Sequence, residues 1–324
     1  MRKIGQFLPD VFTQLIIVAV IVASFLPCHG RGAVFFGDLT IFAIAVMFFL
    51  QGARLSREAV IAGMAHWRLH LLILCCTFLL FPLLTFSLRA LFPTLLSPPL
   101  MVGLLYVSLL PSTVQSSIAF TSIAYGNVPA AICAATLSTI LGVVVTPAAC
   151  GLLLGAKHGG LDFHGVEEVF AELLLPFIAG QLLRPWLIGW VTRHQAVIKL
   201  TDRASIILVV YTAFSAAVVG GIWHQLPLMS FVIICLVSCL LLTLVLLITT
   251  YGSRALGFAR TEEIAIVFCG SKKSAATGVP MANILFGATT VGFIILPLLI
   301  FHQIQLLACS AIAKHYARQH DEAA

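Results

Sequence analysis

Long apolar segments separated by short polar connections run through the whole chain. Each is long enough to cross a hydrocarbon core of about 30 Å as a helix rising about 1.5 Å per residue. The segments cover residues 8–27, 35–53, 69–92, 98–124, 128–155, 168–190, 203–222, 227–251, 262–286 and 288–313. The pattern therefore predicts an all-α polytopic membrane protein with ten transmembrane helices.

The composition excludes a water-soluble globule, because 60% of the residues are hydrophobic and only 9% are charged, against about 25% charged in soluble domains. The basic residues stand singly between apolar segments, so we expect no nucleic-acid partner. Most cysteines lie in the apolar segments and none forms a CxxC pair, so we expect no cofactor and no metal site.

The distribution of Lys and Arg predicts that both termini are cytoplasmic. With that orientation, thirteen of the eighteen basic residues fall inside and three outside, and the remaining two are Lys272 and Lys273 within a span. Such an excess on the cytoplasmic side is typical of membrane proteins. We also expect the protein to lie in the plasma (inner) membrane.

Ten spans divide into two halves of five, residues 1–157 and 158–324, and an odd number of spans makes two similar halves face opposite ways. Inverted repeats of this kind are typical of secondary transporters. Pro111 with the polar residues after it interrupts the fourth span, and Gly270 to Pro280 interrupts the ninth. We therefore expect helices four and nine to be broken at corresponding positions, where such transporters bind their solute.

Lys272 lies about 18 Å below Arg260 if the ninth span is helical, close to the middle of the bilayer. A lysine at that depth costs roughly 2.5–3.5 kcal/mol in insertion scales and normally faces a cavity or a partner. Snorkelling of Lys272 and Lys273 from a helix end is the simpler alternative, and their depth argues against it.

The candidate site consists of polar residues near these interruptions, and their proposed role is substrate or ion binding. They are Ser271, Lys272, Lys273 and Ser274 in span nine, Ser112, Thr113, Gln115, Ser116 and Ser117 in span four, and Thr136, Ser138 and Thr139 in span five. Helix packing explains the span-five residues equally well. His302 is a possible proton relay, although a hydrogen-bonded packing histidine explains it as readily.

Several stretches resemble the bile acid:sodium symporter family, in particular its SBF-like branch. They are Phe49–Ser56, Leu110–Ser112, Tyr125–Val128, Thr136–Thr139 and Gly270–Ser274, of which the last is the most specific. The resemblance implies a panel domain from spans 1, 2, 6 and 7, a core domain from spans 3–5 and 8–10, and a crossing of helices 4 and 9 within the core.

The sequence departs from the sodium-coupled members of that family. They place Glu where this chain has Phe268, Gln-Asn where it has Lys272 and Lys273, and hydroxyls where it has Ala131 and Ala135. Sodium requires several hard oxygen ligands, so the resemblance combined with these losses predicts transport without sodium. Burial disfavours a charged lysine and a neighbouring ammonium adds to this, so proton coupling is one alternative and uniport is another.

The leading hypothesis is a secondary active transporter that moves an organic or inorganic anion by alternating access, with the solute and the lipid bilayer as its partners. The alternative is a non-transporting membrane regulator or sensor built on a transporter fold. An intramembrane enzyme using a lysine as base or nucleophile is disfavoured, because no acid partner or nucleophile–base spacing accompanies the lysines.

Overall fold

The computed structural model describes residues 11–54, 66–154, 163–221, 226–287 and 290–323, and all its regular elements are helices. In chain order they are α1 (Val11–Phe25), α2 (Arg31–Arg54), α4 (Trp67–Cys75), η2 (Cys76–Leu80), α5 (Phe81–Leu91), α6 (Pro98–Leu109), α7 (Gln115–Ile123), α8 (Val128–Leu154), α9 (Phe163–Arg193), α10 (Gln195–Val219), α12 (Leu228–Ala255), α13 (Arg260–Gly270), α14 (Ala275–Leu285) and α15 (Val291–Ala323). Some sequence expectations lie outside the described residues: the boundary at 157/158, the chain start, and the basic residues Arg2, Lys3, Arg57 and Lys157.

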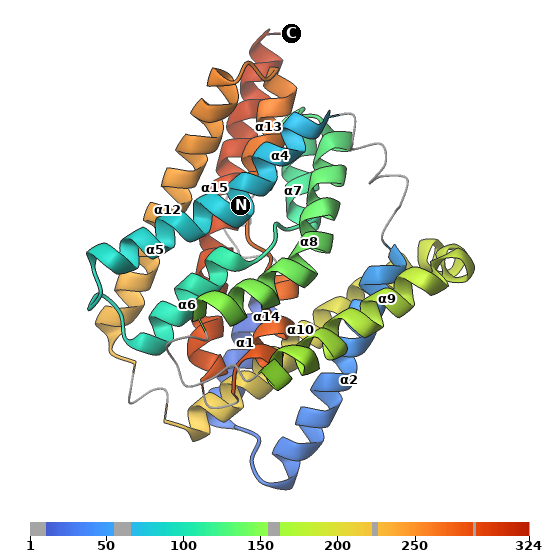
Figure 1. Ribbon diagram of the computed structural model, residues 1–324, viewed down its shortest axis with the longest axis vertical. Coiled ribbons are helices and arrows are strands. Elements are labelled where there is room, and N and C mark those ends of the chain that lie inside the picture. The colour runs from blue at the N-terminus through green and yellow to red at the C-terminus, as the bar shows by residue number, and fades with distance from the viewer. Residues whose placement is uncertain (1–10, 55–65, 155–162, 222–225, 288–289, 324) are drawn as a thin grey trace, which may run out of the picture.

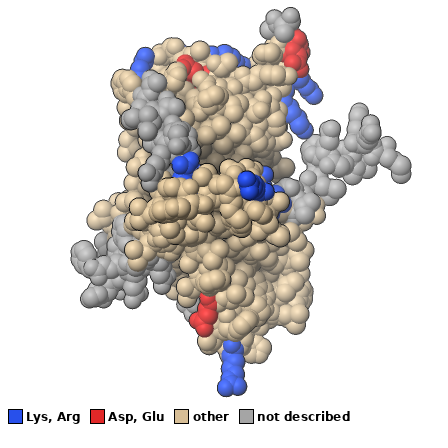
Figure 2. Space-filling model, turned by 90° about the vertical axis from the view of Figure 1, so that its right-hand side faces the viewer, with Lys and Arg blue, Asp and Glu red and all other residues tan. Residues whose placement is uncertain are grey.

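Seven helices within the described ranges are long and apolar enough to cross a membrane. They are α2, the continuous α4–η2–α5 helix, α8, α9, α10, α12 and α15. On the face shown in Figure 2, charged side chains form a few small groups separated by broad uncharged areas. Large apolar side chains such as Leu236 (65% exposed) and Leu79 (65% exposed) lie on the outside, as expected for a surface in contact with lipid.

Two helices extend furthest beyond one end of the apolar segment that predicts them. The helix α10 begins at Gln195 rather than 203, and α15 runs to Ala323 rather than 313. Polar residues lower the hydropathy of both extensions, but each has a face that packs: Ile198 is buried in α10 and Tyr316 is nearly buried in α15. Tertiary packing of one face therefore extends each helix beyond its apolar segment.

Both predicted interruptions are confirmed. The fourth apolar segment is divided into α6 and α7 by the non-helical residues 110–114, and the ninth into α13 and α14 by residues 271–274. Figure 1 shows both gaps in the middle part of the molecule.

The helices α1, α2, α9 and α10 pack together as one group, and α2 and α9 make the most extensive contact (Figure 1). Their crossing depends on two glycines. A Cβ at Gly52 would lie 2.0 Å from the carbonyl oxygen of Phe177, and a Cβ at Gly180 would lie 1.9 Å from the carbonyl oxygen of Phe49. Small residues of this kind let two membrane helices approach each other closely.

The substitution Gly180→Val is expected to destabilise the protein strongly, because the added side chain meets backbone that cannot turn aside. Overpacking typically costs about 1–3 kcal/mol, and we expect the upper end of that range. The matched control is Gly189→Val on the same helix, where a Cβ meets nothing within 4 Å. Thermal unfolding in detergent would measure both variants, and equal unfolding temperatures would contradict the close contact.

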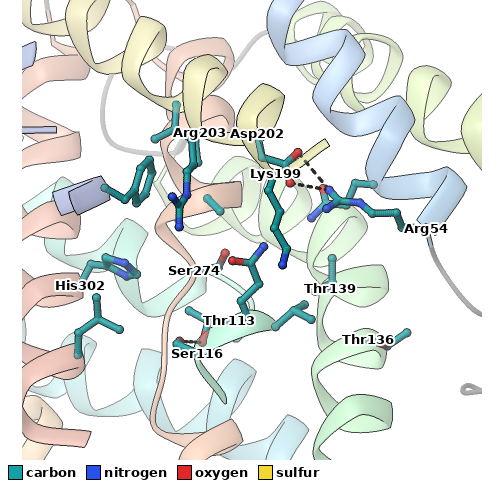
Figure 3. A pocket seen from close by; sticks show the side chains of 17 residues that line it. Arg54, Thr113, Ser116, Thr136, Thr139, Lys199, Asp202, Arg203, Ser274 and His302 are labelled. Atoms are coloured by element: carbon teal, nitrogen blue, oxygen red, sulfur yellow. Dashed lines mark hydrogen bonds and ion pairs between the residues drawn. The ribbon is translucent and has the colours of Figure 1, made fainter. Parts of the chain in front are cut away.

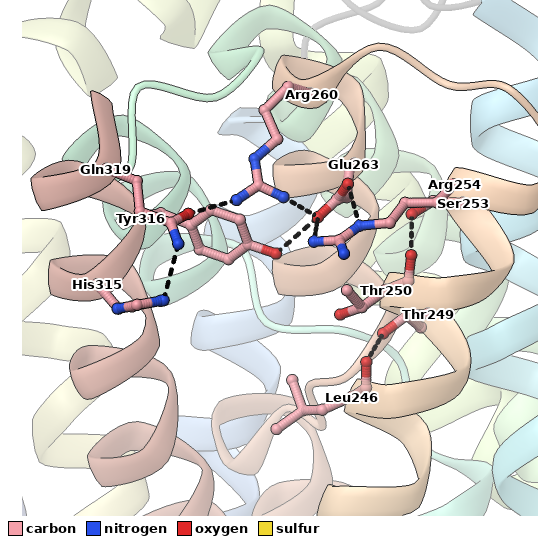
Figure 4. A network of polar contacts seen from close by, with 10 residues as sticks. All are labelled: Leu246, Thr249, Thr250, Ser253, Arg254, Arg260, Glu263, His315, Tyr316 and Gln319. Atoms are coloured by element: carbon pink, nitrogen blue, oxygen red, sulfur yellow. Dashed lines mark hydrogen bonds and ion pairs between the residues drawn. The ribbon is translucent and has the colours of Figure 1, made fainter. Parts of the chain in front are cut away.

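A network of hydrogen bonds and ion pairs holds the N-terminal end of α13 (Figure 4). Glu263 is 3% exposed and accepts hydrogen bonds from Arg254 at 2.9 and 3.0 Å, from Arg260 at 2.6 Å and from the Tyr316 hydroxyl at 2.9 Å. Arg260 also donates to Gln319 at 2.6 Å. One carboxylate therefore connects α12, α13 and α15.

Candidate functional site

The two interruptions are joined by hydrogen bonds. The Ser274 N–H donates to the Pro111 carbonyl at 2.9 Å, the Ser112 hydroxyl donates to the Cys269 carbonyl at 2.5 Å, and the Ser117 hydroxyl donates to the Phe268 carbonyl at 2.9 Å. Broken helices expose backbone groups that must find partners in a membrane. Here each interruption supplies partners to the other.

Local sequence explains where each helix stops and restarts. Leu110 precedes a proline, which disfavours helical backbone at Leu110, and its ψ of 152° is extended. After the second gap, Ser274 caps α14 by accepting the Thr277 N–H on its side-chain oxygen at 3.3 Å. Serine is among the preferred residues at a helix N-cap.

Lys273 is fully buried, and its ammonium makes three hydrogen bonds to backbone carbonyls. The acceptors are Thr77 at 2.6 Å, Ser108 at 2.7 Å and Leu110 at 2.8 Å. An ammonium has three donors and no acceptor, so three carbonyl oxygens satisfy it completely in its charged form. Ser108 and Leu110 lie at the C-terminal end of α6, where the helix dipole also favours a cation.

The Thr77 carbonyl is available because the helix contains a π-turn there. The Phe81 N–H bonds to the Cys76 carbonyl, five residues back, and Pro82, the next residue, has no N–H to donate. Thr77 thereby loses its usual backbone donor and can accept from Lys273. Turns of the π type occur often at functional sites.

Lys272 has a different environment, although it is equally buried. Its ammonium nitrogen makes no hydrogen bond to any described residue. It lies 3.9 Å from the ring centroid of Phe120 and 5.4 Å from that of Phe268. Cation–π contact is the main interaction available to it there.

The place where the two interruptions meet is called the interruption crossing, or crossing, below. A cavity of about 340 Å³ lies beside it, between the group α1, α2, α9 and α10 and the remaining helices (Figure 3). Its lining residues come from both sides. They are Phe12, Gln51, Arg54, Thr113, Val114, Gln115, Ser116, Thr136, Thr139, Lys199, Asp202, Arg203, Ile206, Ser274, Ala276, His302 and Leu306. A cavity of this size falls in the range of small-molecule sites.

The charged residues of the cavity are on α2 and α10. Arg54 pairs with Asp202 at 2.8 Å. Lys199 and Arg203 have no ion pair or hydrogen bond with the residues that the structure describes, and Arg203 only contacts the Phe12 ring, at 5.6 Å. Figure 3 shows both side chains extending from α10 into the cavity. Three cations against one carboxylate leave two positive charges.

Two helix N-termini lie on the opposite side of the cavity. The first turn of α7, with Gln115 and Ser116, and that of α14, with Ser274 and Ala276, line it. The first N–H groups of a helix have no intrahelical partner and carry partial positive charge, so helix N-termini favour anions. Together with the cations, they make the cavity suited to an anionic solute.

The sequence-derived site is divided between the cavity and the helix crossing. Thr113, Gln115, Ser116, Thr136, Thr139, Ser274 and His302 line the cavity. The other candidates lie in or beside the crossing and do not line this cavity: Ser112, Ser117, Ser138, Ser271, Lys272 and Lys273. The serines and Lys273 are hydrogen-bonded there, and the Lys272 ammonium lies against phenyl rings. The role of Lys272 and Lys273 in substrate or ion binding stays a prediction.

Sequence reasoning missed the cavity cations Arg54, Lys199 and Arg203, which it counted only as signals of orientation. The available signal was the spacing of Lys199 and Arg203, four residues apart and so on one helix face, with Asp202 beside them.

His302 Nδ1 accepts a hydrogen bond from the Gln305 amide nitrogen at 2.9 Å. Gln305 also accepts from the Lys273 N–H and donates to the Lys273 carbonyl, each at 2.8 Å. His302 is therefore linked to the crossing as well as to the cavity. Within the described ranges, no group of three His, Cys, Asp or Glu residues that could hold a metal ion is found.

The fold and cavity together define an all-helical integral membrane protein with a solute-sized site between two groups of helices. The chain belongs to the SBF-like CPA transporter family, whose model matches residues 10–318.

The relatives extend over nearly the whole chain. An uncharacterized protein of Pseudomonas aeruginosa is 52% identical over 320 residues (98% of this chain, 96% of the relative). The Escherichia coli protein named "Putative symporter YfeH" is 50% identical over 313 residues (97% and 94%). Sodium/bile acid cotransporter 7 of Rattus norvegicus is 28% identical over 323 residues (96% and 94%). The family comprises transporters and symporters rather than enzymes.

Proposed function

We propose that this protein is a secondary active transporter that moves a small anion across the plasma (inner) membrane by alternating access, without sodium coupling. The observation that carries the proposal is the cavity, in which Arg54, Lys199 and Arg203 face two helix N-termini across the boundary between two groups of helices. A site made from both groups can open to either side if one group moves against the other.

The proposed architecture has ten spans, made of the seven long helices, α1 and the two broken pairs α6/α7 and α13/α14. The two inverted repeats would be residues 1–157 and 158–324. The panel domain would be α1, α2, α9 and α10, which pack together, and the core domain would hold the crossing. Both termini would be cytoplasmic, which places the cavity cations near the inner face.

Absence of sodium coupling is supported by the occupants of the crossing. Three carbonyl oxygens of the kind that bind hard cations already hold the Lys273 ammonium. Phe268 is fully buried, as are Ala131 and Ala135, at positions where the resemblance expects oxygen ligands. Lys273 would thus act as a tethered cation that supplies the charge a sodium ion would bring.

Uptake by the purified full-length protein in proteoliposomes tests this function. The probes are labelled succinate, butyrate, sulfate and taurocholate, with sodium outside or replaced by choline, and with or without an imposed pH gradient. We expect uptake of at least one anion at equal rates in sodium and choline, since the cation site is filled. Stimulation by sodium would contradict the proposal, and absence of flux for every anion would favour the non-transporting regulator. The pH gradient separates proton coupling from uniport.

A further inference from the structure

We propose that the solute is a small organic dianion with two separated charges, of the dicarboxylate class, held with one carboxylate at each wall of the cavity. This inference rests on the proposed function for its transport, but its binding can be measured separately.

The size of the cavity favours a small solute. Its volume of about 340 Å³ is close to the lower end of the roughly 300–1,000 Å³ found for ligand sites. A four-ring steroid with an anionic side chain needs more space than that. The cavity therefore suits a short-chain solute better than the bile acid that appears in the names of some relatives.

The charge of the cavity favours two negative charges over one. Asp202 neutralises Arg54 through their 2.8 Å ion pair, which leaves Lys199 and Arg203 without an anionic partner among the described residues. Both side chains are exposed, so water solvates them until a ligand arrives. A dianion brings as much negative charge to the cavity as its lining residues leave uncompensated, and a monoanion brings half of it.

The positive groups lie on two different walls. Lys199 and Arg203 belong to α10, whereas the N-termini of α7 and α14 belong to the opposite wall (Figure 3). The Thr113 and Ser116 hydroxyls on that wall are hydrogen-bonded to each other at 2.7 Å. A carboxylate is well matched to an arginine fork at one end and to the partial positive charge of helix N-termini at the other. Sulfate carries both charges on one compact group, whereas a dicarboxylate separates them along its chain and can present one to each wall.

Apolar side chains from both walls also line the cavity. They are Phe12, Val114, Ile206, Ala276 and Leu306. An inorganic anion gains nothing from them, whereas the methylene groups of a dicarboxylate would be removed from water, which favours binding by about 0.8 kcal/mol per methylene in transfer data. A cavity with positive groups on two walls and apolar side chains between them therefore favours an organic dianion.

The test is binding to the purified full-length protein in detergent, followed by thermal unfolding and by calorimetry. Succinate and glutarate are the probes, with butyrate, sulfate and taurocholate as comparisons. We expect the two dicarboxylates to raise the unfolding temperature and the other three to have little effect. Lys199→Gln and Arg203→Gln should each weaken succinate binding about tenfold or more, because each removes a charge-assisted contact. The control Arg193→Gln removes an exposed charge outside the cavity and should leave binding unchanged.

Each outcome decides a separate question. Succinate binding that Arg203→Gln weakens, without flux in proteoliposomes, would support the dianion site and overturn transport. Flux of sulfate or butyrate without dicarboxylate binding would support anion transport and overturn the dianion. Equal binding of sulfate and succinate, or taurocholate binding lost in Lys199→Gln, would also overturn the dicarboxylate class.

Discussion

Replacing Lys273 with methionine is expected to destabilise the protein severely, whereas the same change at the adjacent Lys272 should be neutral or stabilising. Lys273→Met leaves the carbonyls of Thr77, Ser108 and Leu110 without their donor, and each buried group left unsatisfied costs about 1–3 kcal/mol. Lys272→Met instead removes a buried ammonium that has no hydrogen-bond partner among the described residues, and methionine packs well against Phe120 and Phe268.

Thermal unfolding of the two variants in detergent measures this difference, and each variant serves as the control of the other. Similar unfolding temperatures would show that the three-carbonyl site contributes little. A smaller side chain adds a further check: Lys273→Ala vacates the site, so sodium should restore part of its stability while choline should not, because carbonyl oxygens bind small hard cations.

Replacing Glu263 with glutamine is expected to give the second large loss of stability. The carboxylate holds Arg254, Arg260 and Tyr316 together, and removing one partner of a buried pair costs roughly 3–5 kcal/mol. We expect less than that here, because the two arginine side chains are 48% and 45% exposed and water can screen them.

The control for this prediction is Glu262→Gln, which changes the neighbouring acid. The Glu262 side chain accepts one exposed capping hydrogen bond from the Ala259 N–H at 3.1 Å, so its loss should cost much less. Both variants would be measured by chemical or thermal unfolding in detergent. A larger loss of stability in Glu262→Gln would show that the Glu263 network does not hold the N-terminal end of α13.

Hydropathy and helix-breaking residues were sufficient to predict much of the fold. The apolar segments correspond to the helices of the structure, and Pro111 and Gly270 marked the two gaps because each is a poor helix former followed by a run of polar residues. Proline alone is a weaker signal, since Pro147 and Pro297 lie inside helices. The helix starts were less predictable. Lys199 and Asp202 lower the hydropathy at the start of α10, although that part is a regular helix.

The site was harder to predict for a geometric reason. Lys272 and Lys273 are neighbours in sequence, but in the non-helical gap their side chains reach different surroundings: carbonyls in one case and phenyl rings in the other. Sequence shows that both are deep but not which way each points. Lys199 was missed for another reason. Basic residues near a span end occur in most membrane proteins, so its position did not distinguish a cavity residue from an orientation signal.

The π-turn before Pro82 makes the acceptor for Lys273 depend on a residue far from it in sequence. A regular helix without that proline would return an N–H to the Thr77 carbonyl, and the ammonium would then share that oxygen with a backbone donor instead of being its sole partner. Lys273 and Pro82 therefore contribute to the same interaction. In an alignment of this family, a chain that lacks lysine at the position of Lys273 would have no reason to keep the π-turn, and we expect the two positions to change together.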